Sequence, residues 1–193
     1  MRGHKRERII RVLLIEAQPL SKNELSKRAK CTRQWVISFL KELEAKKLVK
    51  GTRVINPEKL IKYWLPIHKK PKKHGLYMVK EPYQLLRKTK LDYALTTYRA
   101  ENLVQKYLFP SRMDIYIREE DREKWHKLLS KQGLVGAGNI KLIAMDDDHI
   151  LYGKRKINKL YIVSIPQLII DLFTEGGVCV EAAELLTKNV QRI

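Results

Sequence analysis

Residues 21–54, SKNELSKRAKCTRQWVISFLKELEAKKLVKGTRV, predict two helices separated by a tight turn and followed by a short basic hairpin. Ser21 and Glu24 have the spacing of a capping box, in which both side chains accept hydrogen bonds from free backbone N–H groups at a helix start. A short helix is therefore expected over Lys22–Lys30. The two residues that follow break it and can cap the next helix.

The second helix of this stretch is expected over Arg33–Lys47, with Cys31 and Thr32 at its start. Apolar residues recur along it at the spacing of helical turns and give one apolar face: Trp35, Val36, Phe39, Leu40 and Leu43. The opposite face carries hydrogen-bond donors and no acid: Arg33, Gln34, Ser38 and Lys41. An apolar run, the turn Gly51-Thr52 and a second apolar run then predict a hairpin over residues 48–55.

A further apolar stripe lies ahead of this stretch and predicts the first helix of a three-helix core, ending before Pro19: Ile9, Ile10, Leu13, Leu14 and Ala17. Its basic start, Arg2–Arg11, contains four arginines and one lysine. This basic start can be an arm that contacts DNA or a solvated helix end, and the sequence leaves both interpretations open.

The stretch resembles the winged helix-turn-helix family, in which the second helix of the motif lies in the DNA major groove and the hairpin, the wing, touches phosphates. The match covers roughly the first third of the chain. The resemblance implies duplex-DNA contacts from eight residues: Thr32, Arg33, Gln34, Ser38, Lys41, Lys50, Thr52 and Arg53. The alternative is a helical scaffold that binds protein, but the donor-rich face and its basic surroundings favour nucleic acid.

Basic residues are concentrated in the first part of the chain. The 193 residues include 40 Lys and Arg against 21 Asp and Glu, which gives a formal net charge of +19. Residues 1–75 hold 21 basic and 6 acidic residues (+15), whereas residues 76–193 hold 19 and 15 (+4). A polyanionic partner would offset this repulsion, and the uneven distribution is typical of a surface that binds phosphates.

The cysteines and the hydropathy of the chain indicate where in the cell the protein is expected. Cys31 and Cys179 lie far apart and lack the spacing of metal ligands, which is typical of a reducing cytoplasm. No apolar run reaches the length of a membrane span, and no signal peptide is recognised. We therefore expect a cytoplasmic protein without a membrane partner.

Asn56-Pro57-Glu58 predicts the start of another helix over Glu58–Trp64, since Asn caps and Pro suits the first helical position. The sequence PIHKKPKKHG at residues 66–75 contains two prolines, four lysines and a glycine, and it predicts a basic linker. The expected organisation is a winged-helix domain at residues 1–65, a linker at 66–76 and a C-terminal domain at 77–193.

The second half alternates short helical and strand patterns, which predicts an α+β domain with a small sheet. Helices are expected over 81–88, 98–108, 119–132, 167–173 and 181–189. Strands are expected over 113–117, 140–145, 150–152 and 160–163. The turn between the second and third strands would be Asp146-Asp147-Asp148.

Four short motifs carry a second resemblance: Tyr93–Ala100 (YALTTYRA), Asp114–Ile117 (DIYI), Tyr161–Asp171 (YIVSIPQLIID) and Glu181–Glu184 (EAAE). They resemble the C-terminal domain of AbiE-type antitoxins, winged-helix regulators of type IV toxin–antitoxin operons. The likeness spans about residues 90–187. It implies a DNA-binding head on an antitoxin body that represses its own operon. A toxin or a protein of the transcription machinery would then be a partner of the body.

More distantly, this body is similar to a degenerate nucleotidyltransferase fold. Active enzymes of that class need a Gly-Ser pair for the triphosphate and two carboxylates one residue apart on a strand for two metal ions. Here Thr96-Thr97 stand where Gly-Ser would, and Tyr116 stands where the carboxylate paired with Asp114 would. We therefore expect no catalysis, no catalytic residue, no bound metal and no cofactor.

Three other features favour structural interpretations. The run Asp146–Asp148 can bind a cation, but Asp is also common in turns between strands, which we favour. His68, His74 and His149 share no ligand spacing and are expected to be solvated. The glycines of GLVGAGN at residues 133–139 lack the strand-to-helix setting of a dinucleotide-binding loop.

Together these patterns predict a sequence-specific duplex-DNA-binding transcriptional regulator, antitoxin-like in organisation. In this interpretation basic side chains bind phosphates, and the donor-rich helix face reads base edges in the major groove. Two alternatives stay open. One is a binder of structured RNA or the ribosome, since a basic head attracts any polyanion; the other is an enzyme of nucleotidyltransferase descent.

Overall fold

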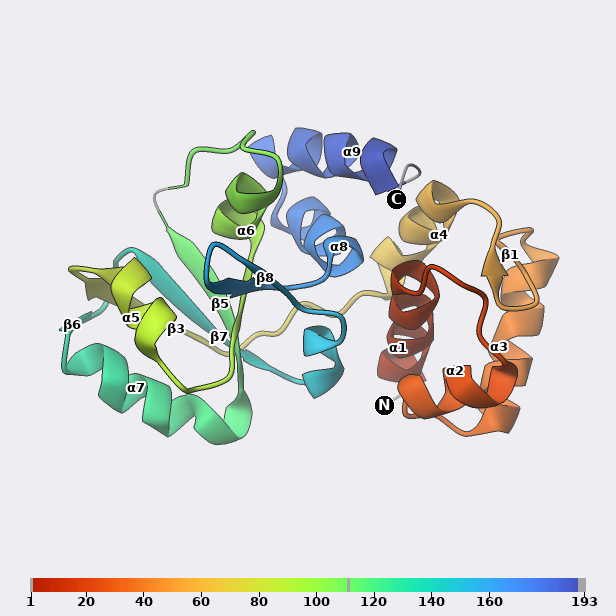
Figure 1. Cartoon of the computed structure of the whole chain (residues 1–193), viewed down its shortest axis with the longest axis horizontal. Helices are drawn as coiled ribbons and strands as arrows, with labels where there is room; N and C mark the ends of the chain where they lie inside the picture. The colour runs from red at the N-terminus through yellow and green to blue at the C-terminus, as the bar shows by residue number, and fades with distance from the viewer. Residues whose placement is uncertain (1, 111, 191–193) are drawn as a thin grey trace.

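The chain begins with three helices, a two-stranded hairpin and a fourth helix (Figure 1). The structure is a computed structural model that describes residues 2–110 and 112–190. We call residues 2–67 the N-terminal unit. Its elements are α1 (Arg2–Ile15), α2 (Lys22–Arg28), α3 (Arg33–Ala45), β1 (Val49–Lys50), β2 (Arg53–Val54), α4 (Pro57–Trp64) and the 3₁₀ turn η1 (Leu65–Ile67).

The helix starts in this unit follow from their capping residues. The Ser21 hydroxyl accepts a hydrogen bond from the Glu24 backbone N–H at 3.0 Å, and the Asn56 side chain accepts one from Lys59 at 2.9 Å. Pro57 occupies the first turn of α4.

The predicted helix starts and the hairpin are confirmed, but α2 and α3 each end two residues earlier than expected. Ser21 caps α2 as predicted, whereas the Glu24 carboxylate binds Arg28 instead of completing the capping box. Ala17 lies beyond α1 and is exposed, so it is not part of the apolar face. The apolar faces meet in one core: Ile9, Ile10, Leu13, Leu25, Val36, Phe39, Leu40, Leu43, Leu60 and Ile61 are all buried.

A seven-stranded sheet forms the rest of the chain, and we call residues 74–190 the sheet body. Its strands are β3 (His74–Val79), β4 (Ala94–Thr96), β5 (Met113–Arg118), β6 (Gly133–Val135), β7 (Ile140–Met145), β8 (Arg155–Ile157) and β9 (Leu160–Ile162). Its helices are α5 (Pro82–Lys88), α6 (Thr97–Val104), α7 (Arg122–Ser130), α8 (Ile165–Glu175) and α9 (Val178–Val190), with 3₁₀ turns η2 (Glu119–Asp121) and η3 (Asp148–Leu151). The α+β class is confirmed.

The strand order is β6-β3-β7-β5-β4-β9-β8, and the sheet is mixed. The β5–β7 and β4–β9 pairs are parallel, while the other neighbours are antiparallel. Helices α5 and α7 lie along one side of the sheet, and α6, α8 and α9 lie along the other (Figure 1). Successive residues of a strand face opposite sides, so Asp114 and Tyr116 face α8 while Ile115 faces α7.

Several local predictions need correction. Ile150–Tyr152 is not a strand, because Asp147 caps the 3₁₀ turn η3 by accepting a hydrogen bond from the backbone N–H of His149. The helix expected to reach Leu108 ends at Val104. Strand β3 begins at His74, inside the stretch predicted as a linker. Residues 1 and 191–193, which the predicted domains included, lie outside the described residues.

The N-terminal unit packs directly on the sheet body. Helix α1 contacts α8, and α4 contacts both α8 and α9. In Figure 1 the two parts meet at α1 and α4, while α3 and the hairpin lie at the opposite end of the molecule. The sheet body therefore leaves α3 uncovered.

Candidate nucleic-acid interface

Helix α3 begins where the sequence places its cap. The Thr32 hydroxyl accepts a hydrogen bond from the Trp35 backbone N–H at 3.3 Å, which satisfies one of the free donors of the first turn. Val36, Phe39, Leu40 and Leu43 are buried against α1 and α2, as the apolar spacing predicts. The direction of this buried face fixes which side chains of α3 point to solvent.

Over residues 33–41 of α3, the exposed side chains are all hydrogen-bond donors. Arg33, Gln34, Ser38 and Lys41 are all exposed. The two acids of the helix are occupied elsewhere: Glu42 accepts from Arg6 at 3.2 Å and from Tyr63 at 2.6 Å, and Glu44 accepts from the backbone N–H of Gly51 at 2.6 Å. Glu44 is exposed at the C-terminal end of the helix, so the donor-rich surface of α3 is confined to residues 33–41.

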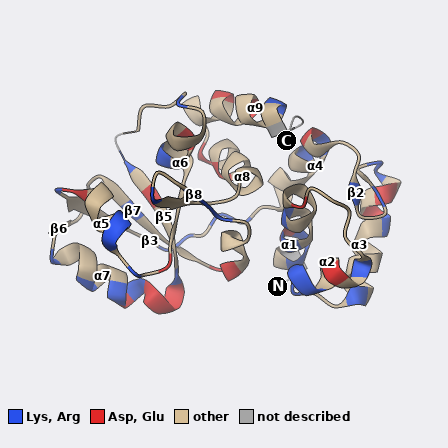
Figure 2. Cartoon of the chain, viewed as in Figure 1, with Lys and Arg blue, Asp and Glu red and all other residues tan. Residues whose placement is uncertain are grey.

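The hairpin next to α3 presents two further basic side chains. Lys50 and Arg53 lie opposite each other on β1 and β2, and both are exposed. Gly51 has φ +62°, which suits glycine at this turn. The Thr52 hydroxyl donates to the Leu20 carbonyl at 2.5 Å, so this side chain is engaged in holding the hairpin against the loop before α2. Figure 2 shows Lys and Arg along α3 and the hairpin.

The basic start of α1 is folded against the protein. Lys5 lies over the Trp35 ring at 5.6 Å, and Arg6 lies over Phe39 at 5.6 Å. Arg8 forms two hydrogen bonds of 2.8 Å with the Asp147 carboxylate. These three side chains therefore contact the rest of the chain, although the Arg6 side chain is still 39% exposed.

Arg11 lies at the centre of the contact between the two parts and is 1% exposed. Its guanidinium donates to Gln167 Oε1 at 2.9 and 2.7 Å and to His149 Nδ1 at 2.9 Å. The other ring nitrogen of His149 then carries the proton and donates to the Arg28 carbonyl at 2.9 Å. Burial, together with the Arg11 charge, lowers the pKa of His149 to about 4, so the ring is neutral at pH 7.

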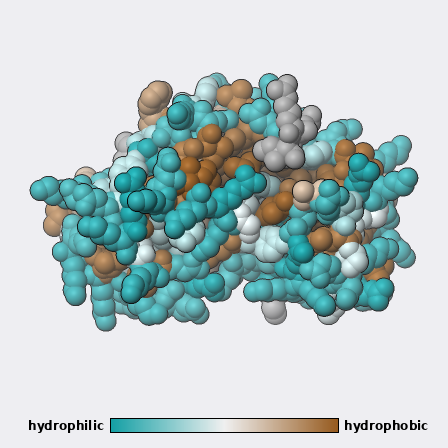
Figure 3. Space-filling view, viewed as in Figure 1, coloured by the Kyte–Doolittle hydropathy of each residue, from teal (hydrophilic) through white to brown (hydrophobic). Residues whose placement is uncertain are grey.

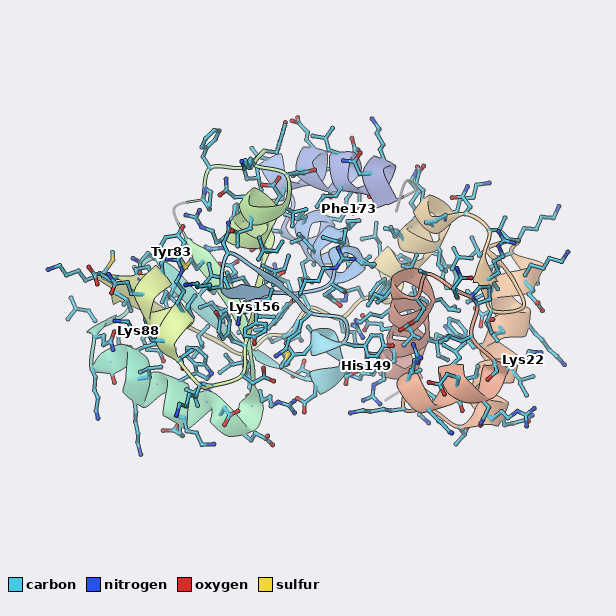
Figure 4. All side chains as sticks on the ribbon, in the orientation of Figure 1. Lys22, Tyr83, Lys88, His149, Lys156 and Phe173 are labelled. Carbon is cyan, nitrogen blue, oxygen red and sulfur yellow. The ribbon has the colours of Figure 1, made fainter. Side chains whose placement is uncertain are left out.

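A second buried contact joins α1 to residue 68. Glu7 accepts hydrogen bonds from Trp64 Nε1 at 2.9 Å and from His68 Nδ1 at 2.7 Å. Burial alone would raise the pKa of Glu7, but these contacts hold it below its usual value. The prediction that His68 and His149 are solvated is therefore wrong. His149 lies where the sheet body meets α1 (Figure 4).

These buried contacts were not predicted from the sequence, although the sequence contains a weak indication of them. Arg11 stands inside the apolar run of the first helix, and Gln167 stands inside that of α8. A polar residue on an apolar helix face must find a partner, because a buried polar group without one is costly. The sequence does not say which partner, since Arg11 and Gln167 are far apart in the chain.

The residues compared with a nucleotidyltransferase site are brought together in the sheet body. Thr96 and Asp114 lie opposite each other on β4 and β5, and the Thr97 hydroxyl donates to Asp114 at 3.0 Å. Arg112 donates twice to the same carboxylate, at 2.6 and 3.0 Å. Tyr116 donates to Asp171 at 3.1 Å. Asp114 is thus bound by its own chain.

The other acidic residues are also dispersed among partners. Asp147 binds Arg8, whereas Asp148 forms an ion pair with Arg118. Within residues 2–110 and 112–190, no group of three or more His, Cys, Asp or Glu side chains is arranged to hold a metal ion. Within these residues, no helix is both long enough and apolar enough to cross a membrane.

Comparisons with known proteins add no relative to this description. No protein-family model, curated protein or solved structure matches the chain. The fold and the positions of individual residues therefore carry the functional argument.

Proposed function

We propose that the N-terminal unit is a winged helix-turn-helix domain and that the protein is a sequence-specific duplex-DNA-binding transcriptional regulator. The observation that carries this proposal is the exposed face of α3 over residues 33–41, which offers Arg33, Gln34, Ser38 and Lys41. The exposed acid Glu44 lies at the end of the helix, where it accepts a hydrogen bond from the backbone N–H of Gly51. An α-helix fits the major groove, where Arg and Lys pair with guanine and Gln pairs with adenine.

The hairpin extends the same surface. Lys50 and Arg53 are positioned to bind the phosphates that flank the groove occupied by α3. Thr52 contributes by fixing the hairpin through its bond to Leu20, and Thr32 by capping α3. Two of the eight candidate residues thus act as positioning residues, and the other six face the DNA.

The sheet body serves as a platform for a partner in this proposal. The rigid packing of α1 against α8 holds the body at a fixed orientation relative to α3. A body fixed in this way suits an antitoxin-like regulator that binds a toxin or a protein of the transcription machinery while on DNA. We propose no enzymatic role, because Arg112 and Thr97 occupy the Asp114 carboxylate.

Selection of genomic DNA fragments by the full chain, followed by sequencing, tests the proposal. We expect a short shared sequence among the bound fragments. The logarithm of the binding constant should fall linearly with that of salt concentration, as counterions are released. Structured RNA added as a competitor should displace the selected DNA only at a large excess. Equal competition by RNA would instead favour the RNA-binding alternative.

A matched pair of variants locates the surface. Arg33→Ala/Lys41→Ala removes two positive charges from α3, and Lys127→Ala/Lys131→Ala removes two from exposed positions at α7. We expect the α3 variant to lose its preference for the selected sequence and the α7 variant to keep it. Loss of preference in the α7 variant alone would place the interface on the sheet body.

A further inference from the structure

A cavity of about 430 Å³ lies between α8 and the middle of the sheet. Its floor is set by strand register, because residues opposite each other on neighbouring strands face the same side. Thr96, Asp114 and Lys141 form one row across β4, β5 and β7, and Tyr116, Ile143 and His74 form the next row. His68, Lys70, Pro71 and Lys72, which precede β3, form the outer wall.

A buried histidine with an unused ring nitrogen lines this cavity. The His68 side chain is 2% exposed and binds Glu7 through Nδ1. Its Nε2 has no hydrogen-bond partner and lies 3.8 Å from Asp171 Oδ1. Buried polar atoms without partners are rare in folded proteins. With Nδ1–H donating to Glu7, Nε2 is an acceptor that a hydroxyl group of a ligand would satisfy.

Two buried carboxylates line the cavity, Asp114 on β5 and Asp171 on α8, and both are held by their neighbours. Asp171 accepts from the hydroxyls of Thr96 and Tyr116 at 2.5 and 3.1 Å and from Gln167 at 2.7 Å. Asp114 is bound by Arg112. Both carboxyl groups already accept from these donors, and their remaining lone pairs can accept hydrogen bonds from neutral hydroxyl groups.

Three lysines line the cavity, Lys70 and Lys72 in the outer wall and Lys141 in the floor beside Asp114. Lys70 is held by Glu175 at 2.8 Å. Lys72 is exposed and Lys141 is half-buried, and both line the cavity. Among the described residues, neither of their ammonium groups forms an ion pair or side-chain hydrogen bond. The cavity therefore offers two lysine ammonium groups together with several hydrogen-bonding groups.

We infer that this cavity binds a small organic phosphate that carries hydroxyl groups, such as a sugar phosphate. The phosphate binds Lys72 and Lys141, and a hydroxyl donates to His68 Nε2. The volume falls within the range of sites for small molecules. Inorganic phosphate would reach the lysines without reaching His68, and an uncharged sugar would reach His68 without using the lysines. This inference stands whether or not the protein binds DNA.

Calorimetric titration of the full chain tests the inference with four probes: ribose 5-phosphate, glucose 6-phosphate, ribose and inorganic phosphate. At least one sugar phosphate should bind with a Kd at least about tenfold lower than those of ribose and inorganic phosphate, since it alone makes both sets of contacts. Equal binding of the sugar phosphates and inorganic phosphate, or no binding of either sugar phosphate, overturns it.

Variants separate the cavity from the basic surface of the N-terminal unit. Lys72→Gln and Lys141→Gln should each raise the Kd of the sugar phosphate at least about fivefold, as expected for loss of a charged hydrogen bond. Lys73→Gln is the matched control, because Lys73 follows Lys72 in the chain but lies outside the cavity and pairs with Glu119 at 3.0 Å. Binding that survives both cavity variants and is lost in Arg33→Ala/Lys41→Ala would place the ligand on α3 and overturn the assignment.

Discussion

Arg11 and Arg33 both belong to the N-terminal unit, but their surroundings differ completely. Arg11 is buried, and its guanidinium binds Gln167 and His149. Arg33 is exposed at the first turn of α3 and forms no side-chain hydrogen bond or ion pair among the described residues. The first arginine is satisfied by its own chain and holds the two parts together. The second has its hydrogen-bonding capacity available for a partner.

The same contrast holds for the two regions as a whole. At the contact between α1 and α8, polar side chains are enclosed and matched to one another, so their chemistry is structural. On α3 and the hairpin, donors face solvent while the nearby acids Glu42 and Glu44 bind other groups. In Figure 3 hydrophilic residues dominate at the α3 end, and hydrophobic residues gather near the middle of the molecule. Burial, more than residue type, separates a structural arginine from a candidate binding one.

Of the substitutions considered, replacing the buried Arg11 should have the largest effect, and this effect should be on the stability of the fold. Arg11→Met leaves Gln167 and His149 without their partner and removes the buried positive charge near Glu7. We expect the free energy of unfolding to fall by about 3 kcal/mol, measured by urea denaturation. Arg33→Met is the control and should change it by less than about 0.5 kcal/mol. Similar small losses from both would mean that Arg11 is not held as described.

Acid should weaken the same buried contact through His149. The pKa of His149 is about 4 in the folded chain, against 6.5 for an ordinary histidine. The neutral buried ring therefore contributes fully to the free energy of unfolding above pH 6.5. As the pH falls from 6.5 to 4, His149 takes up a proton in the unfolded chain before it does so in the folded chain. The free energy of unfolding should therefore fall by up to about 3 kcal/mol.

His149→Gln keeps a donor and an acceptor without titrating in this range. We expect its unfolding free energy to change less than that of the wild type between pH 6.5 and 4.5. The exposed His74→Gln provides the control and should follow the wild type. A wild-type profile that is flat in this window would show that the ring is not neutral and buried.

On the exposed surface, α3 and the hairpin should respond differently. Gln34→Ala should relax the preference at one base pair and cost about 1–3 kcal/mol for the selected DNA, if the contact is bidentate. Lys50→Ala should weaken binding to all DNA sequences about equally. It should also reduce the salt dependence of the binding constant by roughly one phosphate contact. Binding measurements on the selected fragment and a scrambled one separate these effects. A uniform loss from both variants would contradict the placement of α3 in the groove.

The smallest effect is expected at the residue that a nucleotidyltransferase would need. Asp114→Asn should leave DNA binding unchanged, since Asp114 is buried in the sheet body far from α3. Labelled-nucleotide incorporation with magnesium should be undetectable for both the wild type and this variant. Incorporation by the wild type that is lost in Asp114→Asn would establish an enzyme and reject the binding-only proposal.

Much of the N-terminal unit was predictable because its signals are local. A cap such as Thr32 or Asn56 acts within three residues, and an apolar face repeats every three or four residues. The exposed face of α3 follows at once as the side opposite its buried residues. In the sheet body, β5, β7 and β9 were found from their apolar character. The short strands β4 and β8 were missed, and so was the six-residue strand β3, which begins in the Lys- and Pro-rich stretch predicted as a linker.

The sequence by itself determined the α+β class, the helices around α3, the concentration of positive charge and the donors on the outward face. Only the tertiary structure decided that His68 and His149 are buried, that Arg11 binds Gln167, and that the proline- and lysine-rich stretch before β3 walls a cavity. The physical reason is range. Capping and periodicity act between neighbours in the chain, whereas the environment of a buried polar group depends on residues more than a hundred positions away.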